Sequence, residues 1–296
     1  MWEELNKKAV ELFQSGKYSE AVEIAKTALE EAEKEFGPDD PHVARVLNNL
    51  AEMYRAQVNY DDAEPLWKRA LAIREKALGK DHPDVATSLN NLAGAYFEQG
   101  KLAEAEPLFR RSISILERSL ESDHPDIATS LNNLAAVNRA MGKYPAAKPL
   151  YDRALSILVK ALGPDHPEVG TCLNNLAGLY DSLERYKDAE PLYRRALQIA
   201  EKTFGPDHPH VASSLNNLGG TLVGLGNYKE AEIVLVKAQA IIENSYGVGH
   251  PYVAAGLENL AEFYEGTGRA DEAGSLRARA QEIRKGLLKG REERGQ

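Results

Sequence analysis

The chain repeats one short string of residues at a fixed interval of 42 positions. Leu-Asn-Asn-Leu-Ala occupies residues 47–51, 89–93, 131–135 and 173–177, and it recurs at 215–219 and 257–261 with Gly219 and Glu258 as the only changes. A weaker copy occupies residues 5–9, so seven copies follow one another without an insertion or a deletion. A constant period of this size is typical of stacked supersecondary units. We therefore expect one elongated array and not a globule with a single core.

The composition excludes several classes of protein. Of 296 residues, 43% are hydrophobic and 27% are charged, which is ordinary for a folded, soluble chain. The net charge of −9 argues against a nucleic-acid partner, because phosphate binding needs clustered Lys and Arg. Membrane insertion is not expected, because no run reaches the roughly 18 apolar residues of a spanning helix. A start without a secretory leader and a lone cysteine, Cys172, fit a cytoplasmic location.

Each copy has the pattern of two helices. Val85, Leu89, Leu92, Ala93 and Tyr96 are spaced like one face of a helix. A His-Pro-Asp sequence directly before them suits a helix start, because proline needs no hydrogen-bond partner in the first turn. A glycine at position 100 suits a left-handed residue that ends this helix. A second apolar stripe predicts another helix over residues 102–120.

The histidines and the cysteine are interpreted as structural residues. Five histidines stand directly before proline and are expected at helix starts: His82, His124, His166, His208 and His250. Equivalent residues of stacked helices lie about 10 Å apart, so these histidines cannot share a metal ion. His42 and His210 are expected to be isolated and exposed, and Cys172 to be buried in packing. Phosphate-binding loops and nucleophile or zinc motifs are absent from the sequence. We therefore expect no catalytic residue, no metal, no cofactor and no enzyme activity.

The small and large residues of each copy resemble those of a tetratricopeptide repeat (TPR). The second helix of every copy carries alanine at one position: Ala21, Ala63, Ala105, Ala147, Ala189, Ala231 and Ala273. The 42-residue period, together with Leu-Asn-Asn-Leu-Ala, Ala-Glu-Pro-Leu and Asp-His-Pro, is similar to the kinesin light chain type of TPR. The resemblance implies an all-α fold, an α-solenoid that forms a right-handed superhelix of seven TPR helix-turn-helix repeats.

The resemblance also sets the expected domain organisation. A single TPR array is expected over residues 1–290, followed by a polar tail at 291–296. The repeats are expected at about 1–41, 42–83, 84–125, 126–167, 168–209, 210–251 and 252–290. Lys8 and Arg277 replace large apolar residues of the other copies, so the terminal repeats are expected to act as caps.

The second asparagine of the repeated string is the main candidate for ligand binding. It is present six times, as Asn49, Asn91, Asn133, Asn175, Asn217 and Asn259. Asparagine is a mediocre helix former, so six in register need a reason. The TPR resemblance places them on the concave face, where each amide can pair with the N–H and C=O of an extended peptide. Hydrogen bonding between neighbouring repeats is the alternative, and the two roles are compatible.

Other residues on the same helices are expected to give selectivity. Small residues in the middle repeats leave room for a ligand or allow close helix packing: Gly94, Ala136, Gly178 and Gly220. Arg45, Arg55 and Arg139 make the first half basic, while Asp181 and later glutamates make the far half acidic. This polarity predicts that a bound segment directs acidic groups toward repeats 1–4 and basic groups toward repeats 5–7. Phe97 is a candidate to receive an apolar side chain.

These observations favour a non-enzymatic adaptor or scaffold. Its partner is expected to be a protein or peptide, bound as an extended segment in the concave groove through the asparagine ladder. One alternative is a self-associating structural scaffold, a homo-oligomer joined through convex faces or end caps. A second alternative is a regulatory or sensor subunit of a separate catalytic protein.

Overall fold

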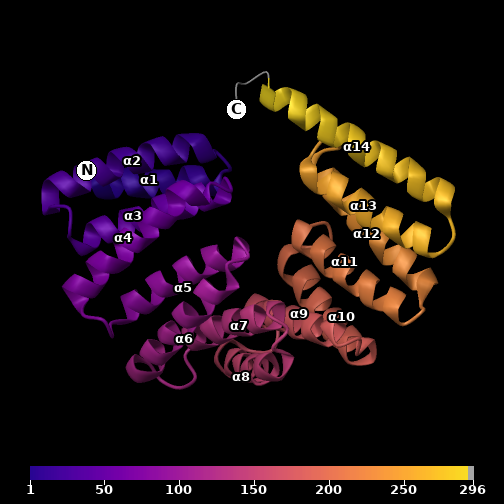
Figure 1. Ribbon diagram of the computed structural model, residues 1–296, viewed down its shortest axis with the longest axis horizontal. Helices are drawn as coiled ribbons and strands as arrows, with labels where there is room; N and C mark the ends of the chain where they lie inside the picture. The colour runs from indigo at the N-terminus through magenta and orange to yellow at the C-terminus, as the bar shows by residue number, and fades with distance from the viewer. Residues whose placement is uncertain (293–296) are drawn as a thin grey trace. The chain divides into compact units, whose positions relative to one another are not determined.

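A computed structural model describes residues 1–292, with side chains described to residue 286. Every regular element in this part of the chain is an α-helix (Figure 1). In chain order the helices are α1 (Trp2–Gln14), α2 (Tyr18–Phe36), α3 (Pro41–Ala56), α4 (Tyr60–Leu78), α5 (Pro83–Glu98), α6 (Leu102–Ser119), α7 (Pro125–Ala140), α8 (Tyr144–Leu162), α9 (Pro167–Ser182), α10 (Tyr186–Phe204), α11 (Pro209–Gly224), α12 (Tyr228–Tyr246), α13 (Pro251–Gly266) and α14 (Ala270–Glu292). They form helix-turn-helix pairs in an all-α array, as predicted.

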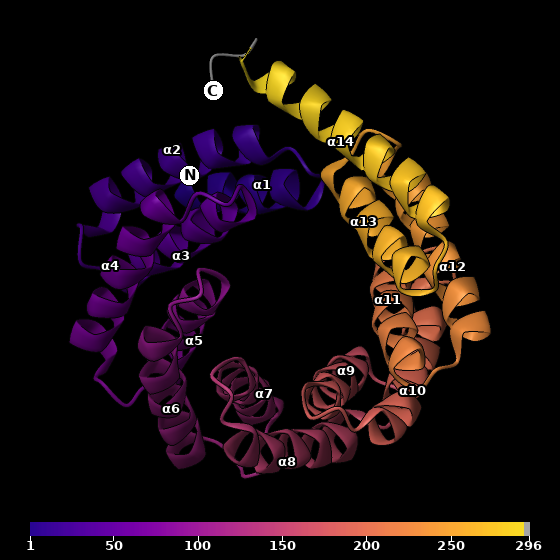
Figure 2. The same ribbon diagram turned by 45° about the vertical axis from the view of Figure 1, so that its right-hand side comes forward.

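The helices group into two compact units. The first unit covers Met1–Ile157, with α1 to α7 and most of α8, and the second begins at Leu158 and holds α9 to α14. Within each unit a helix packs mainly on its neighbours in sequence, and odd-numbered helices also touch, as in α1 with α3 and α9 with α11. In the second unit, α11 and α13 lie on one side and α12 on the other (Figure 2). That residues 1–290 form a single array remains a proposal. Helix α14 includes the first two residues of the expected tail, and residues 293–296 lie outside the described residues.

The histidines before proline cap the odd-numbered helices. In each of α5, α7, α9, α11 and α13 the histidine Nδ1 accepts the backbone N–H two residues later, at 3.1 to 3.3 Å. An N-cap side chain typically accepts such a bond, because the first four backbone N–H groups of a helix have no partner within the helix. The predicted helix-start role is confirmed. The prediction that His42 and His210 are isolated was wrong, because His42 stacks on Phe36 at 4.6 Å and His210 contacts Phe204 at 4.9 Å.

The turn between the two helices of a repeat needs a left-handed residue. Glycine supplies it in five repeats, with φ between 72° and 80°, at Gly16, Gly100, Gly142, Gly226 and Gly268. Val58 and Glu184 occupy the same position in the other two repeats at φ of 59° and 56°. The left-handed region is costly for a residue with a Cβ atom, and most of all for a β-branched one. These two turns therefore carry backbone strain.

The core combines small residues where helices touch with large side chains such as Trp67, Phe109 and Tyr151. The alanines at the conserved position of the second helix are fully buried in the first six repeats and 2% exposed in Ala273. Cys172 is also buried, as predicted. At the ends, Lys8 and Arg277 are exposed to solvent. None of the described helices combines the length and apolarity that a membrane span requires.

Ion pairs join successive second helices at equal spacing. A carboxylate near the end of one such helix pairs with a basic residue 36 positions later: Glu33 with Arg69, Glu75 with Arg111, Glu117 with Arg153, Glu201 with Lys237 and Glu243 with Arg279. We call this set the Glu–Arg ladder. Val159 occupies the carboxylate position in repeat 4, and Arg195 pairs with Asp165 instead.

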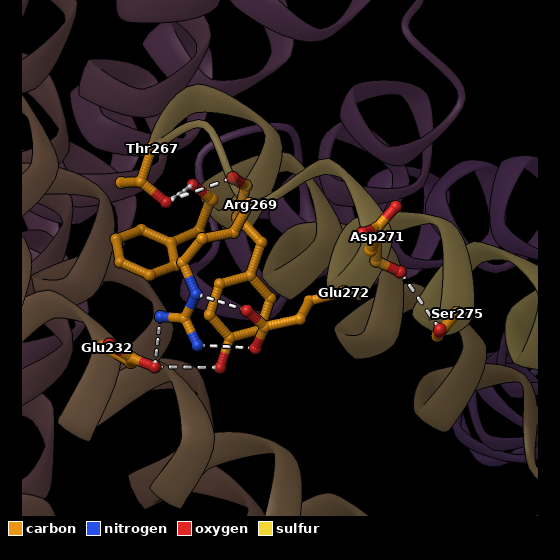
Figure 3. A network of polar contacts seen from close by, with 8 residues as sticks. Glu232, Thr267, Arg269, Asp271, Glu272 and Ser275 are labelled. Atoms are coloured by element: carbon orange, nitrogen blue, oxygen red, sulfur yellow. Dashed lines mark hydrogen bonds and ion pairs between the residues drawn. The ribbon is translucent and has the colours of Figure 1, made fainter.

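Arg269 ties the last helix pair to the repeat before it (Figure 3). Its guanidinium bonds Glu232 of α12 at 2.7 Å and Glu272 of α14 at 2.5 and 2.6 Å. The same group lies 4.1 Å from the ring centroid of Tyr264, whose hydroxyl donates to Glu232 at 3.1 Å. Burial and the neighbouring Glu232 carboxylate raise the pKa of Tyr264, and the hydrogen bonds to Glu272 and Glu232 raise that of Arg269.

Candidate functional site: the asparagine face

The paired asparagines bond from one repeat to the next. Asn49 Nδ2 donates to Asn6 Oδ1 at 3.0 Å, and Asn91 Nδ2 donates to Asn48 Oδ1 at 2.7 Å. In the second unit, Asn217 Nδ2 donates to Asn174 Oδ1 at 3.0 Å. The second asparagine of one repeat thus reaches the first asparagine of the preceding repeat. The alternative of inter-repeat bonding therefore holds at these three positions.

The bonds do not use the whole hydrogen-bonding capacity of the amides. A side-chain amide has two N–H donors and a carbonyl with two lone pairs. Each ladder bond takes one N–H of the second asparagine and leaves its carbonyl oxygen outside that bond. Most of these asparagines are half-buried, while Asn217 and Asn259 are exposed. The ladder bonds therefore hold three of these amides in place, and none of the six second asparagines is fully buried.

The remaining ladder positions differ in their surroundings. Asn133 Oδ1 accepts from Asn132 Nδ2 of the same helix at 3.4 Å. Asn175 is half-buried on α9. Asn259 lines two of the cavities described below. Of the three bonds between paired asparagines given above, two lie in the first unit and one lies in the second.

The basic residues of the first unit are engaged within the protein. Arg45 pairs with Glu3 at 3.0 Å and lies over the ring of Trp2, 4.8 Å from its centroid. Arg55 bonds Glu52 at 2.9 Å and Glu98 at 2.7 Å. Burial lowers the pKa of Arg55, the two carboxylates raise it, and the net direction is upward. A ligand carboxylate would have to compete with these pairs.

Phe97, Arg139 and Asp181 occupy the position of Arg55 in the next three repeats. Arg139 is half-buried on α7 and makes no ion pair with the side chains that the structure describes. Phe97 is half-buried near the end of α5. Asp181 accepts from Thr221 Oγ1 at 3.0 Å, which links α9 to α11. Among the predicted charged residues in the described part of the chain, Arg139 is therefore the one that a ligand could pair with without first displacing a partner within the protein.

Gly94 and Gly220 leave the space above their helices unfilled. A Cβ atom built on Gly94 or Gly220 would meet no heavy atom within 4 Å. Gly219, one residue earlier, faces the other way, since its Cβ would lie 2.6 Å from Leu235 Cδ2. Close helix packing therefore explains Gly219, whereas Gly94 and Gly220 leave room above the helices.

In the second unit, three cavities are bordered by asparagines of the repeated string: Asn174, Asn216 and Asn259. Two lie between α11 and α13, with volumes of 540 and 290 Å³, and both are lined by Asn216 and Asn259. The third, of 360 Å³, lies between α9 and α11 over α10 and includes Asn174. Ligand pockets typically have volumes of about 300–1,000 Å³. The asparagine amides thus border cavities large enough for side chains of a bound chain.

Tyr246 and Tyr252 line the largest cavity and were missed in the sequence. The junctions that lead into α5, α7 and α9 have leucine at the helix end and an acidic residue at the helix start, whereas Phe36 with His42 and Phe204 with His210 place two aromatic rings there. These positions therefore carry either an aromatic pair or a leucine with an acidic residue, whereas the candidate residues were sought among positions that repeat in nearly every copy.

Comparison with known proteins bears directly on the fold. The family model of the tetratricopeptide repeat matches residues 5–64, 43–118, 84–158, 126–202 and 182–244. The chain belongs to the tetratricopeptide repeat family. None of the curated proteins compared matches this TPR chain.

Several solved structures resemble the TPR chain. A kinesin light chain protein of Podosopora anserina with nearly identical TPR-like repeats is 27% identical, with a TM-score of 0.59, over 68% of this chain and 95% of that one. BtubC from P. vanneervenii is 24% identical, with a TM-score of 0.61, over 80% and 92%. A Rap protein in complex with competence and sporulation factor is 17% identical, with a TM-score of 0.70, over 97% and 76%. The TPR array is thus similar to kinesin light chain-like repeats, and the Rap likeness concerns the fold alone.

Proposed function

We propose that this chain is a protein-interaction adaptor that binds an extended segment of a partner along the asparagine face. The observation that carries the proposal is the set of ladder bonds, because each holds an amide in place by one N–H and leaves its carbonyl outside the bond. Preorganised amides lose little freedom on binding and can pair with any peptide backbone.

The spacing of the ladder suits an extended chain. Stacked helices lie about 8–10 Å apart, and an extended chain advances about 3.3 Å per residue. One amide per repeat therefore matches every third residue of a bound segment. The cavities beside Asn174, Asn216 and Asn259 give the intervening side chains a place to enter.

The similar structures support a binding role. The Rap protein of similar fold was solved in complex with competence and sporulation factor. For the present chain we propose a protein or peptide partner, with acidic groups near Arg139 and basic groups near the exposed glutamates of α13. TPR folds serve many functions, so the proposal depends on the amides themselves.

The test compares two substitutions that break the same internal bond. Asn91→Ala removes the donor and Asn48→Ala removes the acceptor of the bond of 2.7 Å. Partners are captured from source lysate by the wild type and by each variant, after circular dichroism shows equal folding. A partner lost with Asn91→Ala and kept with Asn48→Ala supports the clamp. Equal capture by all three forms would assign the ladder to stability alone.

A further inference from the structure

The 540 Å³ cavity between α11 and α13 has aromatic walls. Tyr246, the last residue of α12, and Tyr252, near the start of α13, lie 5.1 Å apart by ring centroids. His208 and His210, at the start of α11, stack 5.2 Å apart on the opposite side. All four rings line the cavity, and Asn216 and Asn259 line it further along the helices. We call this space the aromatic cavity.

Tyrosine occupies both positions at one junction of repeats. Phe36 with His42 and Phe204 with His210 occupy the same two positions at two other junctions. The position of Tyr252 is occupied by Asp84, Asp126 and Glu168 in repeats 3 to 5. The position of Tyr246 is occupied by Leu78, Leu120 and Leu162. Tyr252 is 58% exposed and Tyr246 is 40% exposed, so burial in the core does not explain the two rings. The two rings instead contact each other and line the cavity.

The lining selects for uncharged groups. It contains histidines, tyrosines, asparagines, serine and apolar residues, and no Asp, Glu, Lys or Arg. His208 Nδ1 accepts the backbone N–H of His210 at 3.2 Å, which assigns the proton of the neutral ring to Nε2. Aromatic rings prefer other rings at centroid distances of about 4.5–7 Å. The walls therefore suit a flat aromatic side chain, and a charged one would lose its hydration without gaining an ionic partner.

A second, more apolar cavity adjoins the aromatic one. The 360 Å³ cavity between α9 and α11 is lined by Ala196, Ile199, Ala200 and Phe204. His210 and Ser213 line both cavities, so the two are neighbours one repeat apart. A separation of about 10 Å between stacked helices corresponds to about three residues of extended chain at 3.3 Å each.

We infer that the aromatic cavity receives an aromatic side chain of the bound segment, and that the adjoining cavity receives an aliphatic side chain three residues away. The inference rests on the proposed function, since it needs a backbone held by the asparagine face. It adds a motif, aromatic-x-x-aliphatic in either chain direction, that the partner must contain.

The first experiment selects ligands without knowledge of the partner. A library of short random peptides is displayed on phage and selected on the full chain. Enrichment of an aromatic and an aliphatic residue three positions apart is the expected result. Enriched peptides that lack an aromatic residue would overturn the inference and leave the proposed function standing. A library from which nothing is enriched would count against both.

The second experiment places the enriched peptide in the cavity. Ala255 lines the cavity and is exposed, and repeat 2 carries Arg45 at the equivalent position, so Ala255→Arg is compatible with the helix. Tyr252→Asp restores the acidic residue of repeats 3 to 5 and removes one wall. Thr129→Arg in repeat 4 is the matched control, at the same helical position and equally exposed.

Affinity is read by fluorescence anisotropy of a labelled peptide, with melting temperatures confirming that all variants fold. Both cavity variants are expected to weaken binding by about tenfold or more, equivalent to about 1.4 kcal/mol. Thr129→Arg is expected to leave the affinity unchanged. Equal affinities for wild type, Ala255→Arg and Tyr252→Asp would refute the cavity assignment, even if the peptide still needs the asparagines.

Discussion

At the scale of single residues, backbone conformation is repeated as strictly as sequence. Glycine takes the left-handed turn position in five repeats, and Val58 and Glu184 adopt nearly the same φ without its freedom. Val58 is 72% exposed, so its side chain gains little from burial that offsets the strain. Such residues are candidates for stabilisation because the fold imposes the angle regardless of the side chain.

Val58→Gly is expected to stabilise the protein by about 1 kcal/mol, since relief of a strained left-handed valine exceeds the entropy cost of glycine. The change is measured as a rise in melting temperature by calorimetry. Gly100→Val, at the equivalent turn, is the reciprocal substitution and should lower it. A lower melting temperature for Val58→Gly would show that the turn is not strained.

Some residue roles were readable from the sequence and others were not. The helix-start histidines and the buried alanines were predicted because their roles are local and recur at every copy. The partners of Arg55 were not, because the contact with Glu98 joins different repeats and depends on side-chain rotamers. Tyr246 and Tyr252 were missed because their positions are aromatic in some copies and aliphatic or acidic in others.

At the scale of helices, ion pairs connect each repeat to the next. Glu106 of α6 pairs with Lys143 at 2.7 Å and with Arg110 at 2.7 Å, and its side chain is only 16% exposed. Lys143, and after it Arg110, hold the pKa of Glu106 below its ordinary value of 4.5. The charged form is thus favoured in the folded state, which links the stability of this helix pair to pH.

Glu106→Gln is expected to destabilise the protein at neutral pH by about 1 kcal/mol or less, as for other largely solvent-screened pairs. Because the folded pKa is lowered, the contribution is complete above the ordinary glutamate pKa and disappears as pH falls through the lowered value. Urea unfolding of wild type and variant should therefore differ at pH 7 and converge in acid. A difference that is constant with pH would assign the effect to packing.

Val159→Glu is expected to complete the Glu–Arg ladder. The new carboxylate would stand 36 positions before Arg195, as Glu117 stands before Arg153. The gain is expected to be about 0.2–1 kcal/mol at low salt and smaller at high salt. Val159→Gln, which has similar shape and no charge, is the control. Equal melting temperatures for the two variants would indicate that Arg195 stays with Asp165.

At the scale of the whole molecule, stability is distributed along the chain. Each helix packs mainly on its neighbours in sequence, within two compact units. In such arrays stability is approximately a sum of repeat terms and nearest-neighbour interfaces. The all-α array of paired helices was predictable from the period, because a strict repeat fixes the local contacts. The division at Ile157 was not, because the sequence pattern continues through α8 without a change.

A packing error in one unit is expected to remain local. Ala231→Leu overfills a fully buried site of α12, and Ala63→Leu does the same in α4. Hydrogen exchange measured by mass spectrometry should show faster exchange in the unit that carries the substitution and little change in the other. Uniformly faster exchange for both variants would indicate one cooperative unit.

The exact 42-residue period of the sequence has a consequence for how such a gene can change. Glu64 pairs with Lys101 and Glu106 pairs with Lys143, in both cases 37 positions later. The start of one copy can therefore be joined to the remainder of another while these pairs keep the same separation in sequence. Unequal crossing-over between equivalent points of two copies then adds or deletes one whole copy and keeps such pairs at the same separation. Length, and with it the number of residues that a ligand must present, is thus the property that recombination can alter most easily.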